Sequence, residues 1–97
     1  IEGLAFDARG PNAAERRHLE RIKGMACAVC AAPGPSDAHH IRQGQGLSQR
    51  APHWLAVPLC KACHQGPDGI HGSKNLWKVH RVDEMAVLAE TIARLVA

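Results

Sequence analysis

The chain has 97 residues, of which 45% are hydrophobic but only 3% are aromatic, and its formal net charge is +3. This length suits one small domain, and because much of the apolar content is alanine, we expect a thin core. No apolar run approaches the ~20 residues of a membrane span, and no apolar signal segment is present, so we expect a cytoplasmic protein without a membrane partner. The start, Ile1-Glu2-Gly3, lacks methionine and suggests either an excised domain or a foreign sequence at the N-terminus.

Residues 1–24 are expected to form a loose lead-in followed by a bracing helix. Asn12 and Glu15 fit a capping box, in which each side chain accepts a backbone N–H of the other residue. The helix is predicted to run to about Lys23, with Gly24 placed to stop it. Its basic side chains could also touch phosphate, but bracing is the favoured role.

The four cysteines form two matched pairs, Cys27–Cys30 and Cys60–Cys63, each with CxxC spacing. Each pair brings two thiolates to one side of a tight turn, and two such turns make a tetrahedral zinc cage. A structural zinc contributes ~10–16 kcal/mol near neutral pH, which would support a thin core. Disulfides fit secreted chains better, and a thiol redox protein would need a thioredoxin-like pattern, so we expect structural zinc.

Between the two pairs, the pattern predicts a hairpin with strands at residues 37–42 and 54–59 and a long polar loop, Pro58 marking an edge or strand end. A turn or short helix then carries Cys63 and His64, and Ser73 is placed to cap the next helix. Asp83 is predicted to cap an amphipathic helix that reaches the C-terminus. Residues 25–97 therefore form one zinc-stabilised domain. The predicted apolar face of the last helix, expected to be core or a docking surface, comprises Met85, Val87, Leu88, Ile92, Leu95 and Val96.

Seven histidines are many for a chain of 97 residues, and five of them lie between positions 39 and 71. The cysteine pairs should bring the strand that carries His39 and His40 close to the segment that carries His64 and His71. Neighbouring strand residues point to opposite faces, so one of the His39–His40 pair should face a metal and the other the substrate or a water. Three neutral imidazoles with open coordination positions are typical of a catalytic metal site. Of the remaining two, His18 is expected to be a solvated surface residue and His80 to interact favourably with the dipole at a helix C-terminus.

The order of these motifs resembles a known family. The first CxxC is followed by Ala38-His39-His40-Ile41, a polar loop, Val57-Pro58-Leu59-Cys60-x-x-Cys63-His64, and Gly69-Ile70-His71-Gly72. Over about residues 25–81, this arrangement resembles the HNH endonucleases, in particular the zinc-knuckle branch and its phage-type, recombination-enhancing members. The resemblance implies a ββα-metal core with a two-CxxC zinc site, in a protein of a bacterial or phage-infected cell. With the two helices predicted above, the expected fold is a small α+β domain in which this core is flanked by an N-terminal helix and a C-terminal amphipathic helix.

The resemblance also implies an activity, namely metal-dependent hydrolysis of phosphodiester bonds in DNA with one catalytic metal. His39, His64 and His71 stand where the family has metal ligands, and His40 stands where it has the general base. The family's middle asparagine is missing, and His53 is the expected substitute. The insertion Gly66-Pro67-Asp68-Gly69 makes the spacing from His64 to His71 longer than the usual single turn.

The basic surplus lies in the same region, with six lysines and arginines against two aspartates between positions 36 and 81. We expect DNA as the partner, bound with little sequence specificity or targeted by another domain or protein, because phosphate contacts fix position without reading sequence. The expected catalytic metal is Mg²⁺ or Mn²⁺, although imidazole-rich sites also take Zn²⁺ or Ni²⁺. A zinc-dependent nucleic-acid-binding module without catalysis and a degenerate HNH scaffold remain alternatives. The candidate phosphate contacts are Arg42, Arg50, Lys61, Lys74 and Lys78.

Overall fold

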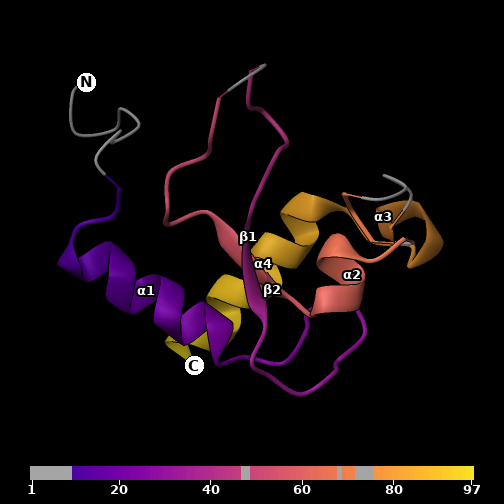
Figure 1. The fold of residues 1–97 in the computed structure, drawn as a ribbon, viewed down its shortest axis with the longest axis horizontal. Helices are drawn as coiled ribbons and strands as arrows, with labels where there is room; N and C mark the ends of the chain where they lie inside the picture. Colours follow the sequence, from indigo (N-terminus) through magenta and orange to yellow (C-terminus); the bar gives the residue numbers. More distant parts are fainter. Residues whose placement is uncertain (1–9, 47–48, 68, 72–75) are drawn as a thin grey trace.

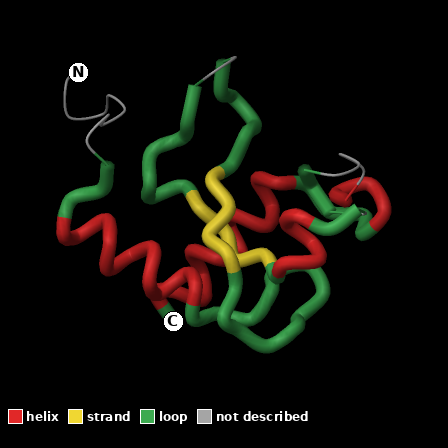
Figure 2. Tube along the Cα trace, viewed as in Figure 1, coloured by secondary structure: helices red, strands yellow, loops and turns green. Residues whose placement is uncertain are grey.

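A computed structural model describes the chain except for residues 1–9, 47–48, 68 and 72–75. The described part is a small compact α+β fold with a radius of gyration of 13.2 Å. Figures 1 and 2 show a two-stranded hairpin in the middle, with α1 and α2 on opposite sides of it and α4 behind it. The elements in chain order are α1 (Ala13–Lys23), β1 (Asp37–His40), β2 (Ala56–Leu59), α2 (Lys61–Gln65), α3 (Leu76–Val79) and α4 (Glu84–Val96).

The hairpin is antiparallel, with Asp37 opposite Leu59 and His40 opposite Ala56. Both strands are shorter than the predicted ranges 37–42 and 54–59. One further backbone bond, from the Ile41 N–H to the Leu55 carbonyl (3.1 Å), continues the pairing. The next N–H, that of Arg42, donates to a side chain of α4 instead of to the opposite strand, so the ladder ends there.

The N-terminal helix α1 confirms the predicted capping box and its end at Lys23. The Glu15 N–H donates to Asn12 Oδ1 and the Asn12 N–H donates to Glu15 Oε1, both at 2.8 Å. Ile22 is fully buried, which is how this mostly polar helix is held against the hairpin. His18 differs from the expected surface residue: it is half-buried, and its ring lies 4.9 Å from that of Trp54.

The core lies between β2, α4 and the cysteine-bearing turns. All four residues of β2 are buried, and this strand contacts both α1 and α4. Two cysteines belong to the core itself, so the two CxxC turns are part of the packing and not an appendage to it. The buried cluster consists of Cys27, Ile41, Ala51, Val57, Leu59, Cys63, Leu76, Val87 and Leu88.

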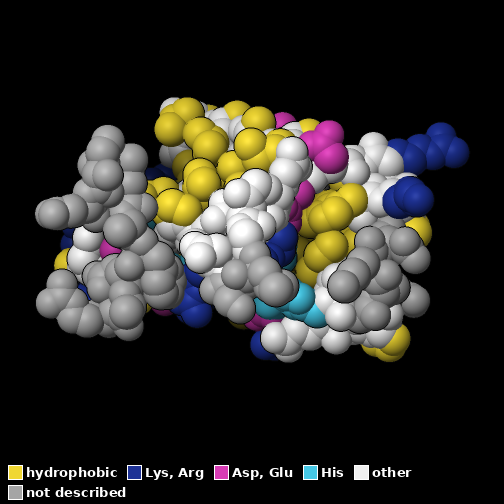
Figure 3. All heavy atoms as spheres, turned by 90° about the horizontal axis from the view of Figure 1, so that it is seen from above, with side chains coloured by type: hydrophobic (Ala, Val, Ile, Leu, Met, Phe, Trp, Pro, Cys, Tyr) yellow, Lys and Arg dark blue, Asp and Glu magenta, His cyan; other side chains and the backbone are white. Residues whose placement is uncertain are grey.

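The C-terminal helix α4 begins after Asp83, whose side chain accepts the Ala86 N–H at 2.7 Å, as predicted. Part of its predicted apolar face is buried and part is exposed. Val87 and Leu88 are buried, but the other buried residues of this helix are polar, Glu84 and Thr91. Met85, Ile92 and Val96, which belong to the same predicted face, are 45%, 44% and 78% exposed, and Figure 3 shows apolar side chains gathered over α4. The predicted cap at Ser73 lies outside the described residues.

Candidate metal centres

The two CxxC turns converge, and their four sulfur atoms lie within 4.8 Å of one another. Cys60 is the N-cap of α2 and Cys63 lies inside that helix, while the turn with Cys27 and Cys30 is joined to β2 by the Ala28 N–H and the Pro58 carbonyl (2.9 Å). The sulfurs of Cys30 and Cys60 are 3.6 Å apart, close to the ~3.8 Å between ligands of a tetrahedral zinc with ~2.3 Å bonds. All four cysteines are free thiols, so the cluster can bind a metal such as zinc.

The pKa values of these thiols indicate that a bound cation would stabilise the cluster. Burial opposes ionisation of Cys27, but backbone N–H groups of Cys30, Cys60 and Val29 outweigh it and lower the pKa of this thiol to about 7. Burial and the neighbouring thiols raise the pKa of Cys63. The Cys27 thiol therefore ionises readily, and its negative charge opposes ionisation of the other thiols. A bound dication removes that opposition, because a coordinating thiol is deprotonated outright.

A second cluster brings together the three histidines expected to be metal ligands. One ligating atom from each of His39, His64 and His71 lies within 4.8 Å of the other two. His39 comes from β1, His64 from α2 and His71 from the segment after α2. The Nε2 atoms of His64 and His71 are 3.0 Å apart, and the ring of His39 lies 5.3 Å and 5.5 Å from their rings.

The long spacing between His64 and His71 does not separate them, because the chain folds back on α2. The Ile70 N–H donates to the Cys63 carbonyl (2.8 Å) and the His71 N–H donates to the His64 carbonyl (3.2 Å). Gly69 permits this close return: a Cβ there would lie 2.6 Å from the Ala62 carbonyl oxygen. The insertion that made the spacing unusual is thus what brings His71 beside His64.

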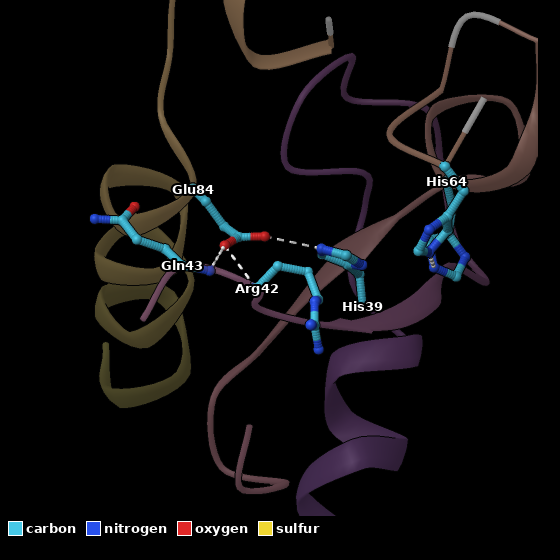
Figure 4. Close-up of polar contacts among 6 residues, drawn as sticks. His39, Arg42, Gln43, His64 and Glu84 are labelled. Carbon is cyan, nitrogen blue, oxygen red and sulfur yellow. Dashed lines mark hydrogen bonds and ion pairs between the residues drawn. The ribbon is translucent and has the colours of Figure 1, made fainter. Parts of the chain in front are cut away.

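Two carboxylates that are not among the predicted site residues accept hydrogen bonds from these histidines. Asp37 accepts from His64 Nδ1 at 2.9 Å. Glu84 accepts from His39 Nε2 at 3.0 Å, as Figure 4 shows. A carboxylate only accepts, so the network assigns the ring protons to those two nitrogens. Burial lowers the pKa of His39, and the hydrogen bond with Glu84 opposes that shift. The hydrogen bond from His64, with Lys61 adding to it, lowers the pKa of Asp37.

His40 and His53 form a separate pair beside the histidine cluster. His40 Nε2 and His53 Nδ1 are 2.9 Å apart, across the start of the hairpin loop. Burial, followed by the charges of His53, Arg50 and His39, lowers the pKa of His40 to about 4. His53 is 5% exposed, and within the described part of the chain its Nε2 has no hydrogen-bond partner.

The histidine cluster opens onto a hollow of about 500 Å³, and Figure 3 shows histidine side chains reaching the surface there. Of the five candidate phosphate contacts, the structure places Arg42 and Arg50 in its lining. Arg42 also donates to the carbonyls of Gln49 and Gly46, which holds the hairpin loop. A larger hollow of about 860 Å³ along α1 has neither histidine nor cysteine in its described lining and is assigned no role.

Two of the other three candidate phosphate contacts, Lys61 and Lys78, are not in the lining of this hollow. The amine of Lys61 is 3.2 Å from Asp37, and this side chain is 81% exposed. Lys78 is exposed on α3. Lys74 lies outside the described residues. Arg42 and Arg50 are therefore the two cations that the described structure offers to an anion bound beside the histidines.

Comparison with protein-family models, with curated proteins and with solved structures found no match for this chain. Within the described ranges, none of the helices has both the length and the apolar character needed to cross a membrane. The geometry of the two clusters therefore carries the functional argument.

Proposed function

We propose that the chain is an HNH-type, metal-dependent endonuclease that hydrolyses phosphodiester bonds in DNA. The observation that carries this proposal is the convergence of His39, His64 and His71 on a hollow that His40 also lines. A set of three imidazoles that opens onto a hollow suits a catalytic metal, whereas a closed set of four thiolates suits a structural one. The HNH-like order of motifs in the sequence supports the same assignment.

His39, His64 and His71 would hold one divalent cation, Mg²⁺ or Mn²⁺ in use, although three imidazoles also suit Zn²⁺ or Ni²⁺. The ion would supply Lewis-acid stabilisation of the negative charge that grows on the phosphate oxygens. Asp37 keeps the proton of His64 on Nδ1, which leaves Nε2 free to ligate. Arg42 and Arg50 line the same hollow and can position a phosphate through charge-assisted hydrogen bonds.

His40 is the proposed general base. Its Nε2 is engaged by His53, so Nδ1 is the ring nitrogen that can accept a proton from the attacking water. In this tautomer the His40 Nε2–H donates to His53 Nδ1, and His53 orients the base as the family's asparagine would. The water oxygen would bond to phosphorus as its proton passes to His40, the bond from phosphorus to the 3′ oxygen would break, and the departing 3′ oxygen would take a proton from solvent.

One observation favours the second candidate, a zinc-dependent nucleic-acid-binding module or HNH scaffold without catalysis. A pKa of about 4 makes His40 a weaker base than a free imidazole, whose pKa is about 6.5. His40 is still neutral at pH 7 and can accept a proton. Its share of the rate enhancement then lies toward the low end of the ~10²–10⁴-fold that general-base catalysis gives.

The test is DNA cleavage by the zinc-loaded protein, with plasmid and single-stranded DNA in Mg²⁺, Mn²⁺ or EDTA. We expect cleavage in Mg²⁺ or Mn²⁺, and a loss of about 10²-fold or more in His40→Ala with unchanged zinc content. The matched control is His80→Ala, which removes an exposed imidazole outside both clusters and should cut at the wild-type rate. Wild-type cutting by His40→Ala would remove His40 from its role, and DNA binding without any cutting would support the second candidate.

A further inference from the structure

Glu84 is a buried carboxylate that reaches from the C-terminal helix into the histidine centre. It is the first residue of α4 and only 5% exposed. Its Oε2 lies 3.0 Å from His39 Nε2, while its Oε1 accepts the backbone N–H groups of Arg42 and Gln43, both at 2.7 Å. Figure 4 shows the carboxylate between the imidazole on one side and the two amides on the other.

This set of contacts fixes more than the side chain of Glu84. A buried carboxylate is costly unless its oxygens are hydrogen-bonded, and here the two oxygens have three donors between them. Two of these donors belong to the start of the hairpin loop, and the third is the ring of His39. Glu84 therefore holds the loop, the ring and the N-terminus of α4 in one arrangement.

The direction of the bond to His39 decides which ring nitrogen can ligate a metal. Because the carboxylate accepts, the ring proton sits on Nε2, and Nδ1 keeps the lone pair that a metal needs. A ligand histidine typically donates its other N–H to a carboxylate, which fixes the ring and raises its basicity. The arrangement here has that form for His39, as it has for His64 with Asp37.

We propose that Glu84 is a positioning residue of the histidine metal site: it fixes the tautomer and orientation of His39, and thereby couples the docking of α4 to metal affinity. The inference rests on the metal-binding part of the proposed function and is independent of DNA cleavage. It assigns to the C-terminal helix, which carries no metal ligand among its described residues, a direct effect on the site.

Glu84→Gln is the sharpest variant, because it keeps the size of the side chain and can still accept the two backbone N–H groups. Its amide NH₂ would then face His39 Nε2 and require that atom to accept, which moves the ring proton to Nδ1 and blocks the ligating position. The matched control is Glu90→Gln on the same helix, where the lost contact is an exposed ion pair with Arg94. Zinc-loaded proteins would be titrated with Co²⁺ and followed by absorbance and calorimetry.

We expect the second metal to bind roughly 10–100-fold more weakly to Glu84→Gln than to wild type, with no change in Glu90→Gln. Zinc content and amide NMR dispersion should stay as in wild type. Wild-type Co²⁺ affinity in folded Glu84→Gln would overturn the inference, and so would a wild-type protein that takes up no second metal.

A measurement on the wild-type protein keeps the inference testable if Glu84→Gln does not fold. Long-range ¹H–¹⁵N spectra of the zinc-loaded protein without a second metal report which nitrogen of His39 carries its proton. We expect the proton on Nε2, and a proton on Nδ1 would overturn the inference. A protein that binds Co²⁺ with this dependence on Glu84 but cuts no DNA would contradict the proposed nuclease function alone.

Discussion

Removal of zinc from the cysteine cluster should unfold this protein. For 97 residues, the net stability of a domain is about 5–15 kcal/mol, at ~0.05–0.15 kcal/mol per residue. A structural zinc contributes ~10–16 kcal/mol near neutral pH, so its loss is as large as the whole net stability. The structure places the effect in the core, since Cys27 and Cys63 are themselves members of the buried cluster.

The measurement compares the zinc-loaded protein, the chelated protein and the Cys63→Ser variant by thermal unfolding and amide NMR. We expect a cooperative transition only in the loaded wild type, and collapsed amide dispersion in the other two. Ala62→Ser is the control, since it adds a hydroxyl to the same turn at an exposed position and leaves all four thiols in place. A reducing agent alone should change nothing, because the four thiols are free.

The reasoning would be refuted by a chelated protein, or a Cys63→Ser variant, that keeps a cooperative transition within a few degrees of the loaded wild type. That result would mean that the hairpin and α4 bury enough apolar surface without the metal. A loss of the transition in reducing agent would point instead to disulfides.

Two further predictions concern His40 and the core. His40 has a folded-state pKa of about 4, below the ~6.5 of an unfolded histidine, so the unfolded chain binds the extra proton as the pH falls from about 6.5 to 4. Stability should therefore decrease over that range more steeply in wild type than in His40→Ala, measured as urea midpoints of zinc-loaded protein; equal slopes would contradict the burial of a neutral imidazole. Leu59→Ala, at a fully buried position of β2, should cost about 2–5 kcal/mol in the same assay. Val96→Ala, at a side chain 78% exposed, should cost no more than about 0.5 kcal/mol, and a similar cost for both would contradict the placement of the core.

The parts of the fold that depend on residues close together in the sequence were predictable. The capping box needs only Asn12 and Glu15, three residues apart, and the cap of α4 needs only Asp83. The convergence of the four cysteines followed from their spacing, because a shared metal site constrains where two distant turns can lie. The strand ends were placed too far out, because Arg42 turns its N–H to Glu84, 42 residues away, and no local pattern contains that contact.

Glu84 also shows why the buried face of α4 differs in part from the predicted apolar face. Positions 84, 87, 88 and 91 follow helical spacing as well as the apolar set built on Met85 does, but two of the four are polar. A prediction from hydrophobicity alone therefore chose the face that contains Met85, which the structure leaves partly exposed. The available signal was a glutamate in line with Val87 and Leu88, since a carboxylate on a buried helix face needs a partner such as a histidine.

The five-residue helix α2 carries candidate ligands of both clusters, Cys60 and Cys63 for one and His64 for the other. Because Cys63 and His64 are adjacent, the two centres share one turn of backbone and should load in order. If the chain is unfolded without zinc, as predicted above, a cation at the histidines would have to supply the free energy of ordering α2 as well. Its apparent dissociation constant is the intrinsic one divided by the fraction of chains already ordered. Zinc supply to the cysteines would thus set how much of the protein can bind a second metal at all.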